Sequence, residues 1–136
     1  MTNNRKIKTI IIDNDECDLA NLRQYLAGIQ EIEIVGTSTK YKHAIKLLTE
    51  ATFDMLIVCA EISGKLAFDL IQEIRTLKNH KFGVILIAED DRHVIRALRE
   101  SATDYIVKPL NSYKLKTSLD LYQAKKENVQ NYYSKN

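Results

Sequence analysis

Three short apolar runs of this chain end in residues whose side chains can carry chemistry. Asp13, Cys59 and Lys108 each lie at the end of such a run. A carboxylate, a thiol and an ammonium group can hold a cation, bind an anion or supply a reactive sulfur, provided that the fold brings them together. Open parallel sheets do this, because functional groups gather beyond the carboxyl ends of the strands. The elements that carry these residues therefore decide whether they form one site.

Five apolar runs alternate with longer segments of helical period, which is the pattern of a parallel sheet covered by helices on both faces. The runs are 7–12, 32–35, 55–60, 84–88 and 105–107. Apolar residues recur at steps of three and four within 19–29, 44–48, 70–77, 94–98 and 115–122. The sequence therefore predicts a doubly wound α/β domain built as a (βα)5 alternation.

Length and composition indicate one folded domain. The chain has 136 residues, of which 45% are hydrophobic, and no Ser/Gly-rich linker divides it. Its two cysteines are too few for a disulfide framework, and its apolar runs are too short for a signal peptide or a membrane span. We expect a cytoplasmic protein without membrane contact, with a domain at 1–124 and a polar C-terminal helix end or tail at 125–136.

Charge and histidine placement argue against two classes of ligand. The net charge is only +2, from 20 basic and 18 acidic residues, so no general attraction to nucleic acid is expected. The three histidines share no metal-ligand spacing. Oxygen and sulfur ligands from Asp13, Asp15 and Cys59 would suit some metals, but nothing in their spacing selects one. We therefore predict no metal site and no nucleic-acid binding by this domain itself.

A specific resemblance begins in the second half of the chain. The segment 94–98, followed by 102–109 with Tyr105, Lys108 and Pro109, resembles the receiver domain of bacterial response regulators. The resemblance extends from about Lys6 to Tyr122. Within the family, the sequence is similar to receivers that precede LytTR-type DNA-binding domains. It implies a flavodoxin-like or CheY-like fold, with strand order 2-1-3-4-5, and a role in two-component phosphorelay signalling.

The family pattern implies a role for each position at the strand ends. An acidic pair after the first strand and an aspartate ending the third hold Mg²⁺, and that aspartate accepts a phosphoryl group. A hydroxyl after the fourth strand and a lysine after the fifth contact the phosphoryl oxygens. In this chain Asp13 matches the first acid and Lys108 the lysine, while Tyr105 matches an aromatic residue that acts as a conformational switch in the family.

Three positions depart from that pattern. Asn14 stands in place of the second acid, Cys59 in place of the phosphoacceptor, and Ala88 in place of the hydroxyl residue. A thiol and an amide carry less negative charge than two carboxylates, so Mg²⁺ binding is expected to be weak or absent, and no other cofactor is expected. Ordinary aspartyl phosphorylation cannot occur at Cys59. A one-residue slip would bring Asp15 into the acid pair without restoring the acceptor.

Each remaining pocket residue has two interpretations. Cys59 is a reactive thiol if the charge of Lys108 lowers its pKa, or a small buried filler. The nearby Asp13 favours the filler, because its negative charge opposes formation of a thiolate. Lys108 binds an anion, or forms an ion pair with Asp13, which is our default prediction. Tyr105 is an inward-turning switch or an exposed strand-end aromatic residue, and both remain open. A disulfide between Cys17 and Cys59 is not expected in a cytosolic protein.

We therefore predict a receiver-like module that is not an enzyme and that acts through protein contacts without phosphorylation. Its expected partners are a histidine kinase, an output domain or a second copy bound through the face formed by the fourth helix, fifth strand and fifth helix. Two alternatives stay open: a thiol redox sensor that uses Cys59, and the receiver part of a larger DNA-binding transcription regulator. Nucleic acid is expected as a partner only if a separate output domain exists.

Overall fold

The computed structural model describes residues 5–79 and 81–135, and side chains as far as residue 127. Five parallel strands form the main sheet in the order β2-β1-β3-β6-β7, where β4 and β5 are a small separate hairpin. These strands are β1 (Ile7–Ile12), β2 (Ile32–Ser38), β3 (Met55–Cys59), β6 (Gly83–Ala88) and β7 (Asp104–Val107). The predicted order 2-1-3-4-5 and the doubly wound (βα)5 fold are thus confirmed.

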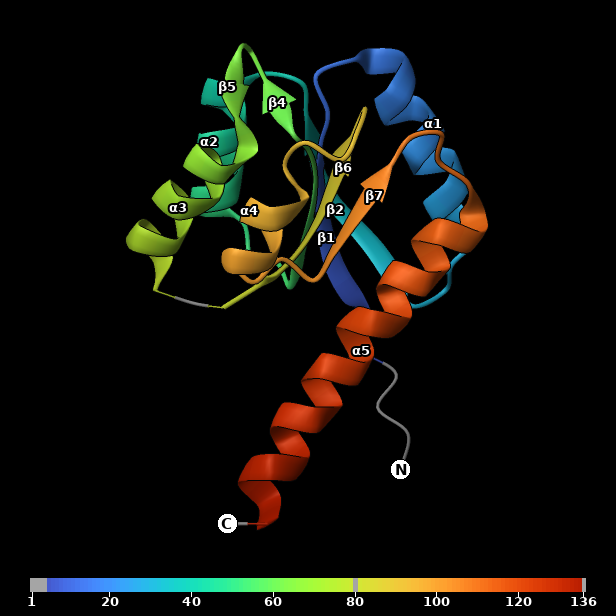
Figure 1. The fold of residues 1–136 in the computed structure, drawn as a ribbon, viewed down its shortest axis with the longest axis vertical. Helices are drawn as coiled ribbons and strands as arrows, with labels where there is room; N and C mark the ends of the chain where they lie inside the picture. The colour runs from blue at the N-terminus through green and yellow to red at the C-terminus, as the bar shows by residue number, and fades with distance from the viewer. Residues whose placement is uncertain (1–4, 80, 136) are drawn as a thin grey trace.

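Helices cover both faces of this sheet, as Figure 1 shows. They are α1 (Glu16–Ala27), α2 (Tyr41–Glu50), α3 (Ala67–Lys78), α4 (Val94–Arg99) and α5 (Ser112–Lys135). α2, α3 and α4 pack on one face, and α1 and α5 on the other (Figure 1). α5 extends past the sheet and contains the predicted polar segment as far as Lys135, whereas Asn136 lies outside the described residues.

The core follows from the alternation of side chains along each strand. Ile10 packs in the apolar cluster under α2 and α3, while its neighbour Ile11 packs in the cluster under α1 and α5. Leu22 and Leu26 face the sheet, fully or almost fully buried, as the helical period predicts. Leu98 marks the period of α4 but is 70% exposed, because this six-residue helix turns only Ala97 fully into the core.

The loop after β3 holds a two-stranded antiparallel hairpin that sequence analysis did not predict. It consists of β4 (Glu61–Ile62) and β5 (Lys65–Leu66). Ser63 and Gly64 join the strands with φ angles of 52° and 77°, which suit the left-handed turns favoured in two-residue hairpins. Strands of two residues have no periodicity to detect. The hairpin stands beside the carboxyl ends of the main sheet, where the candidate residues gather.

Candidate functional site

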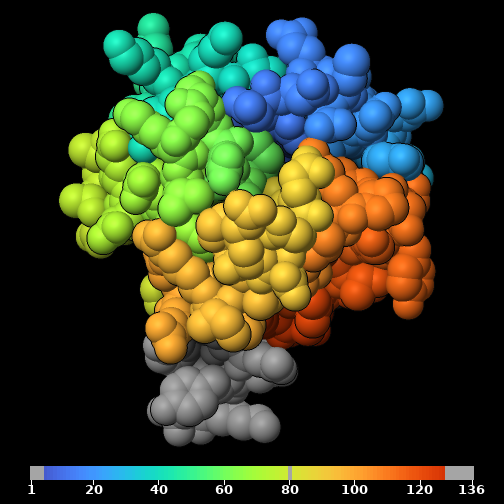
Figure 2. Space-filling model, turned by 45° about the horizontal axis from the view of Figure 1, so that its top comes forward, coloured from blue at the N-terminus to red at the C-terminus, as the bar shows by residue number. Residues whose placement is uncertain are grey.

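A pocket of about 430 Å³ lies at the carboxyl ends of the central strands. Figure 2 views this end of the molecule, where the segments following β1, β3, β6 and β7 meet at the surface. The lining comprises Asp13, Asn14, Asp15, Asp18, Cys59, Ala60, Glu61, Ile87, Ala88, Glu89, Asp90, Arg92, His93 and Lys108. Asp13, Asn14, Cys59, Ala88 and Lys108, which the sequence predicts to meet, therefore do line one pocket.

Asp13, the residue directly after β1, is the most buried acid of the pocket, at 1% exposed. Its Oδ1 accepts the backbone N–H of Asp15 at 2.9 Å, whereas its Oδ2 accepts a hydrogen bond from none of the described residues. Burial raises the pKa of Asp13, and the Asp15 hydrogen bond and the charge of Lys108 only partly oppose this rise. The pocket therefore contains one carboxylate oxygen whose hydrogen-bonding capacity is unused.

The side chain of Asn14 is bonded to the β4–β5 hairpin. Its Oδ1 accepts the backbone N–H of Ser63 at 3.0 Å, and its own backbone N–H donates to Sγ of Cys59 at 3.2 Å. The amide therefore ties the loop after β1 to the turn between β4 and β5. The sequence gives no signal for this bond, because residues 14 and 63 are far apart in the chain and their contact depends on the hairpin.

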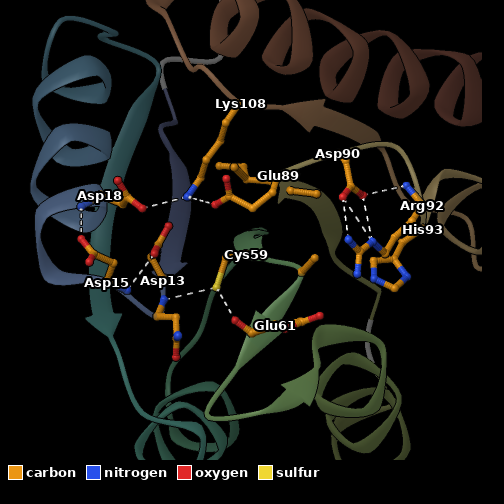
Figure 3. A pocket seen from close by; sticks show the side chains of 14 residues that line it. Asp13, Asp15, Asp18, Cys59, Glu61, Glu89, Asp90, Arg92, His93 and Lys108 are labelled. Carbon is orange, nitrogen blue, oxygen red and sulfur yellow. Dashed lines mark hydrogen bonds and ion pairs between the residues drawn. The ribbon is translucent and has the colours of Figure 1, made fainter.

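Cys59 ends β3 and is 7% exposed. Its S–H donates to the backbone carbonyl of Glu61 at 3.0 Å (Figure 3). Burial raises the pKa of Cys59 to about 11, with a further contribution from the charge of Asp13, and Lys108 offsets only part of the rise. The thiol is therefore protonated at neutral pH, which is the state expected of a small buried filler. Cys17 is a free, exposed cysteine of α1.

Lys108 corrects one prediction. Its ammonium lies 2.8 Å from Asp18 Oδ2 and 3.2 Å from Glu89 Oε1, and it forms no ion pair with Asp13 (Figure 3). Burial lowers the pKa of Lys108, but the bonds to Asp18 and Glu89 outweigh burial and raise it above the usual value. These two carboxylates remain partly hydrated, so pairing with them requires less desolvation than pairing with the buried Asp13. Sequence analysis did not single out Asp18.

Ala88 and Tyr105 complete the predicted set. Ala88 lines the pocket at 5% exposed and offers no hydroxyl group. The phenol of Tyr105 donates to the backbone carbonyl of Asp90 at 2.8 Å. Its ring packs against the apolar cluster under α2 and α3. The structure has Tyr105 partly buried, which lies between the inward and the exposed orientation that the sequence left open.

An octahedral Mg²⁺ site requires several oxygen ligands around one point. Within the described residues, no three His, Cys, Asp or Glu side chains are placed to hold a metal ion together. Asp15 Oδ1 caps α1 through the N–H of Asp18, and Asp90 is paired with Arg92 at 2.8 Å. Two of the carboxylates nearest the strand ends are thus already engaged by the protein.

Comparison with known proteins identifies the family. The family model for the response regulator receiver domain matches residues 9–120. The chain belongs to the response regulator receiver family. Among curated proteins, this receiver domain is 25% identical over 122 residues to the transcriptional regulatory protein MalR of Bacillus subtilis, covering 89% of the chain and 52% of MalR. It is 22% identical over 121 residues to the sensory transduction protein LytT of Bacillus cereus, covering 89% of the chain and 49% of LytT.

Solved structures agree on the fold. The response regulatory domain of MrkE from Klebsiella pneumoniae superposes with a TM-score of 0.78 at 23% identity, covering 90% of this receiver domain and 99% of that chain. The two-component response regulator RcsB in complex with DNA superposes with a TM-score of 0.79 at 18% identity, covering 88% and 61%. The receiver domain spans about half the length of the curated relatives. No helix in its described part is long and apolar enough to cross a membrane.

Proposed function

We propose that this receiver domain acts in two-component signalling through protein contacts, without accepting a phosphoryl group. The protonated thiol of Cys59 carries the proposal, because it ends β3 at the position where the resemblance implies the acceptor. With a pKa near 11 and its S–H bonded to Glu61, Cys59 offers neither a carboxylate nor a ready thiolate. A redox role for Cys59 is disfavoured for the same reason.

Weak or absent Mg²⁺ binding belongs to the same proposal. Asp13 supplies one free oxygen, and the amide oxygen of Asn14 is held by Ser63. Mg²⁺ dehydrates reluctantly, and of the acids that the family pattern implies as its ligands only Asp13 remains, so the attraction that would offset that cost is reduced. Ala88 adds no donor for a phosphoryl oxygen. The pocket therefore lacks one of the acids that would hold Mg²⁺ and the hydroxyl that would contact a phosphoryl oxygen. We infer that the domain is not an enzyme.

The contact surface that we propose is the α4–β7–α5 face. α4 exposes Ile95 and Leu98, at 58% and 70%, and α5 exposes Tyr113 at 79%. Exposed apolar side chains of this size contribute to interaction sites. Charges of both signs accompany them: Arg96, Arg99, Glu100, Asp104, Lys114 and Asp120. A second copy, a histidine kinase or an output domain is the partner we propose, in the cytoplasm.

A second candidate function is the receiver part of a longer DNA-binding transcription regulator. The observation that favours it is the partial coverage of relatives such as MalR, which is named a transcriptional regulatory protein. On this proposal, DNA is bound by the separate output domain, and the α4–β7–α5 face contacts that domain or pairs two receivers. Sequencing the gene downstream of the codon for Asn136 tests it, because an immediate stop codon would contradict a fused output domain.

The experiment for the main proposal is incubation with Mg²⁺ and acetyl phosphate, followed by intact-mass measurement. We expect no added phosphoryl group on the natural chain. The matched positive arm is a triple variant, Asn14→Asp, Cys59→Asp and Ala88→Ser, which restores the residue types that the family pattern implies. A phosphoryl group mapped to Asp13 or Asp15 of the natural chain would refute the proposal.

A further inference from the structure

A second pocket, of about 550 Å³, lies at the amino ends of β6 and β7, opposite the site described above. We call it the amino-end pocket, and its lining comprises Arg75, Asn79, Lys81, Phe82 and Ser101. These residues come from three places: the last turn and cap of α3, the loop before β6, and the turn after α4. Figure 1 shows that α3 and α4 both end on this lower side of the molecule. The two pockets share no lining residue.

The charge of the amino-end pocket has one sign. Two of its side chains are cations, Arg75 and Lys81, two others carry neutral hydrogen-bond donors, and none of the described lining residues is acidic. Neither cation has a carboxylate within ion-pair distance among the described residues. Arg92, Arg96 and Lys108, in contrast, each pair with an acid. A concave site lined by one sign of charge concentrates ligands of the opposite sign.

Arg75 is held in place by the chain without being neutralised. Its Cζ lies 5.5 Å from the centroid of the Phe82 ring, and Nη1 donates to the backbone carbonyl of Glu100 at 3.1 Å, while the Glu100 carboxylate pairs with Arg96. Phe82 is itself buried and packs on the ring of Phe53. Within the described part of the chain, no residue accepts a hydrogen bond from the Nε and Nη2 edge, which suits two acceptor oxygens. A guanidinium fixed in this way loses little conformational entropy when an anion binds.

Stabilising helix ends, the usual role of basic residues near helix C-termini, does not account for Lys81. Lys78 has such a role, because its Nζ donates to the carbonyl of Ala51, the C-cap of α2, and lies over the ring of Phe53. Lys81 follows Asn79, the C-cap of α3, and is exposed. It donates to none of the described residues. Its charge is therefore available to a ligand in the pocket.

A phosphomonoester is the anion that this arrangement fits best. It carries a charge of about −1.5 to −2 at neutral pH, which the two cations balance. Its terminal oxygens accept hydrogen bonds from several directions, and donors here converge from three separate segments of the chain. A carboxylate carries a single charge on a planar group, which Arg75 alone would satisfy. The lone charge of a nucleic-acid phosphodiester would likewise leave one cation unbalanced.

We propose that the amino-end pocket binds a phosphomonoester, with Arg75 and Lys81 on its oxygens and with Asn79 and Ser101 as further donors. The inference goes beyond the proposed function and does not rest on it, because the two pockets share no residue. The volume lies within the usual range for small ligands, about 300–1,000 Å³. A small phosphorylated compound and a phosphorylated side chain of a partner protein present the same chemistry, and the experiment separates them.

The experiment is a calorimetric titration of the whole chain in phosphate-free buffer with two probes, phenyl phosphate and a short phosphoserine peptide with blocked ends. Phenyl sulfate, which carries one negative charge, and the unphosphorylated peptide are the matched ligands. Each should bind about tenfold more weakly than its phosphorylated counterpart, or not at all. Tighter binding of phenyl phosphate indicates a small ligand, and tighter binding of the peptide indicates a protein partner. Added salt should weaken binding of both, since exposed charges are screened.

Variants of the two cations locate the site. Lys81→Ala removes an exposed charge and should weaken binding by about tenfold. The matched control is Lys42→Ala, which removes the same charge from an exposed position in the first turn of α2, at the other end of the sheet, and should leave binding unchanged. Arg75→Met keeps a long side chain over the Phe82 ring but removes the fork, and it should abolish binding.

A third pair of variants keeps the outcome decisive even if Arg75→Met fails to fold. Ser101 has a φ angle of 62°, a conformation that both Asp and Asn tolerate. Ser101→Asp places a negative charge in the pocket and should abolish binding, whereas Ser101→Asn keeps a neutral donor and should bind nearly as well as the natural chain. Absence of binding by both phosphorylated probes, equal binding by Lys81→Ala, or undiminished binding by Ser101→Asp would overturn the inference.

Discussion

The pocket and the α4–β7–α5 face differ in how their side chains are satisfied. In the pocket, Asn14, Cys59 and Lys108 each have partners within the chain. On the face, Ile95 and Leu98 remain largely exposed, at 58% and 70%. Hydrogen bonds and ion pairs within the chain hold the pocket residues in one conformation. Exposed apolar surface is instead suited to binding a partner. Changes in the pocket should therefore alter stability, and changes on the face should alter association.

The largest expected effect comes from returning an acid to the end of β3. Cys59→Asp places a carboxylate beside Asp13 and removes the S–H bond to Glu61. We expect it to lower the free energy of unfolding by about 2 kcal/mol at pH 7, since a buried charged group lacking its partners costs about 1–3 kcal/mol or more. Urea unfolding followed by circular dichroism measures this. Cys59→Asn is the uncharged control, and an equal loss in both variants would exclude charge as the cause.

Asp13 should make stability depend on pH. Because burial raises its pKa, the folded protein keeps a proton that the unfolded chain releases above pH of about 3.9. Stability should therefore fall as pH rises from that value through the raised pKa, by about 1.4 kcal/mol for each unit of the shift, and stay lower above it. Asp13→Asn should remove this fall and be more stable than the natural chain at pH 7. The test is unfolding of the natural chain and of Asp13→Asn from pH 3 to 8. A difference between the two that shifts in favour of the natural chain as pH rises would contradict the unpaired state of Asp13.

The face should show the reverse behaviour. Leu98→Ser and Arg96→Glu should weaken self-association or partner binding by roughly tenfold, or about 1.4 kcal/mol. An exposed substitution such as Leu98→Ser usually changes stability by no more than about 0.5 kcal/mol, whereas Arg96→Glu also removes the ion pair with Glu100 and the contact with the Phe68 ring. Cys59→Ala is the matched pocket variant and should leave association intact. Sedimentation of the three variants under reducing conditions gives the ranking, and loss of association in Cys59→Ala alone would make the thiol the functional centre.

Sequence periodicity was sufficient for the fold, and with the family resemblance it placed Asp13, Cys59 and Lys108 in one pocket, but it did not give the rest of the lining or its bonds. Leu22 and Leu26 set the register of α1, and that register places Asp13 at a strand end as predicted. The pairing of Lys108 with Asp18 was missed, because competition among several nearby carboxylates depends on their relative hydration, which sequence does not report. The β4–β5 hairpin was missed for a different reason: strands of two residues are shorter than any detectable repeat.

The smallest expected effect is the response to Mg²⁺. A ligand stabilises the folded state by RT ln(1 + [L]/Kd), so millimolar Mg²⁺ should leave the melting temperature of the natural chain unchanged if its Kd is far above that concentration. The double variant Asn14→Asp and Cys59→Asp should gain a Mg²⁺-dependent rise, because two added carboxylates supply the oxygen ligands that the pocket lacks. Thermal unfolding of both chains with and without Mg²⁺ makes the comparison. A rise in the natural chain that Asp13→Ala abolishes would mean that one carboxylate and water are enough to hold the ion. The pocket would then retain the metal-binding half of the family pattern despite the loss of its acceptor.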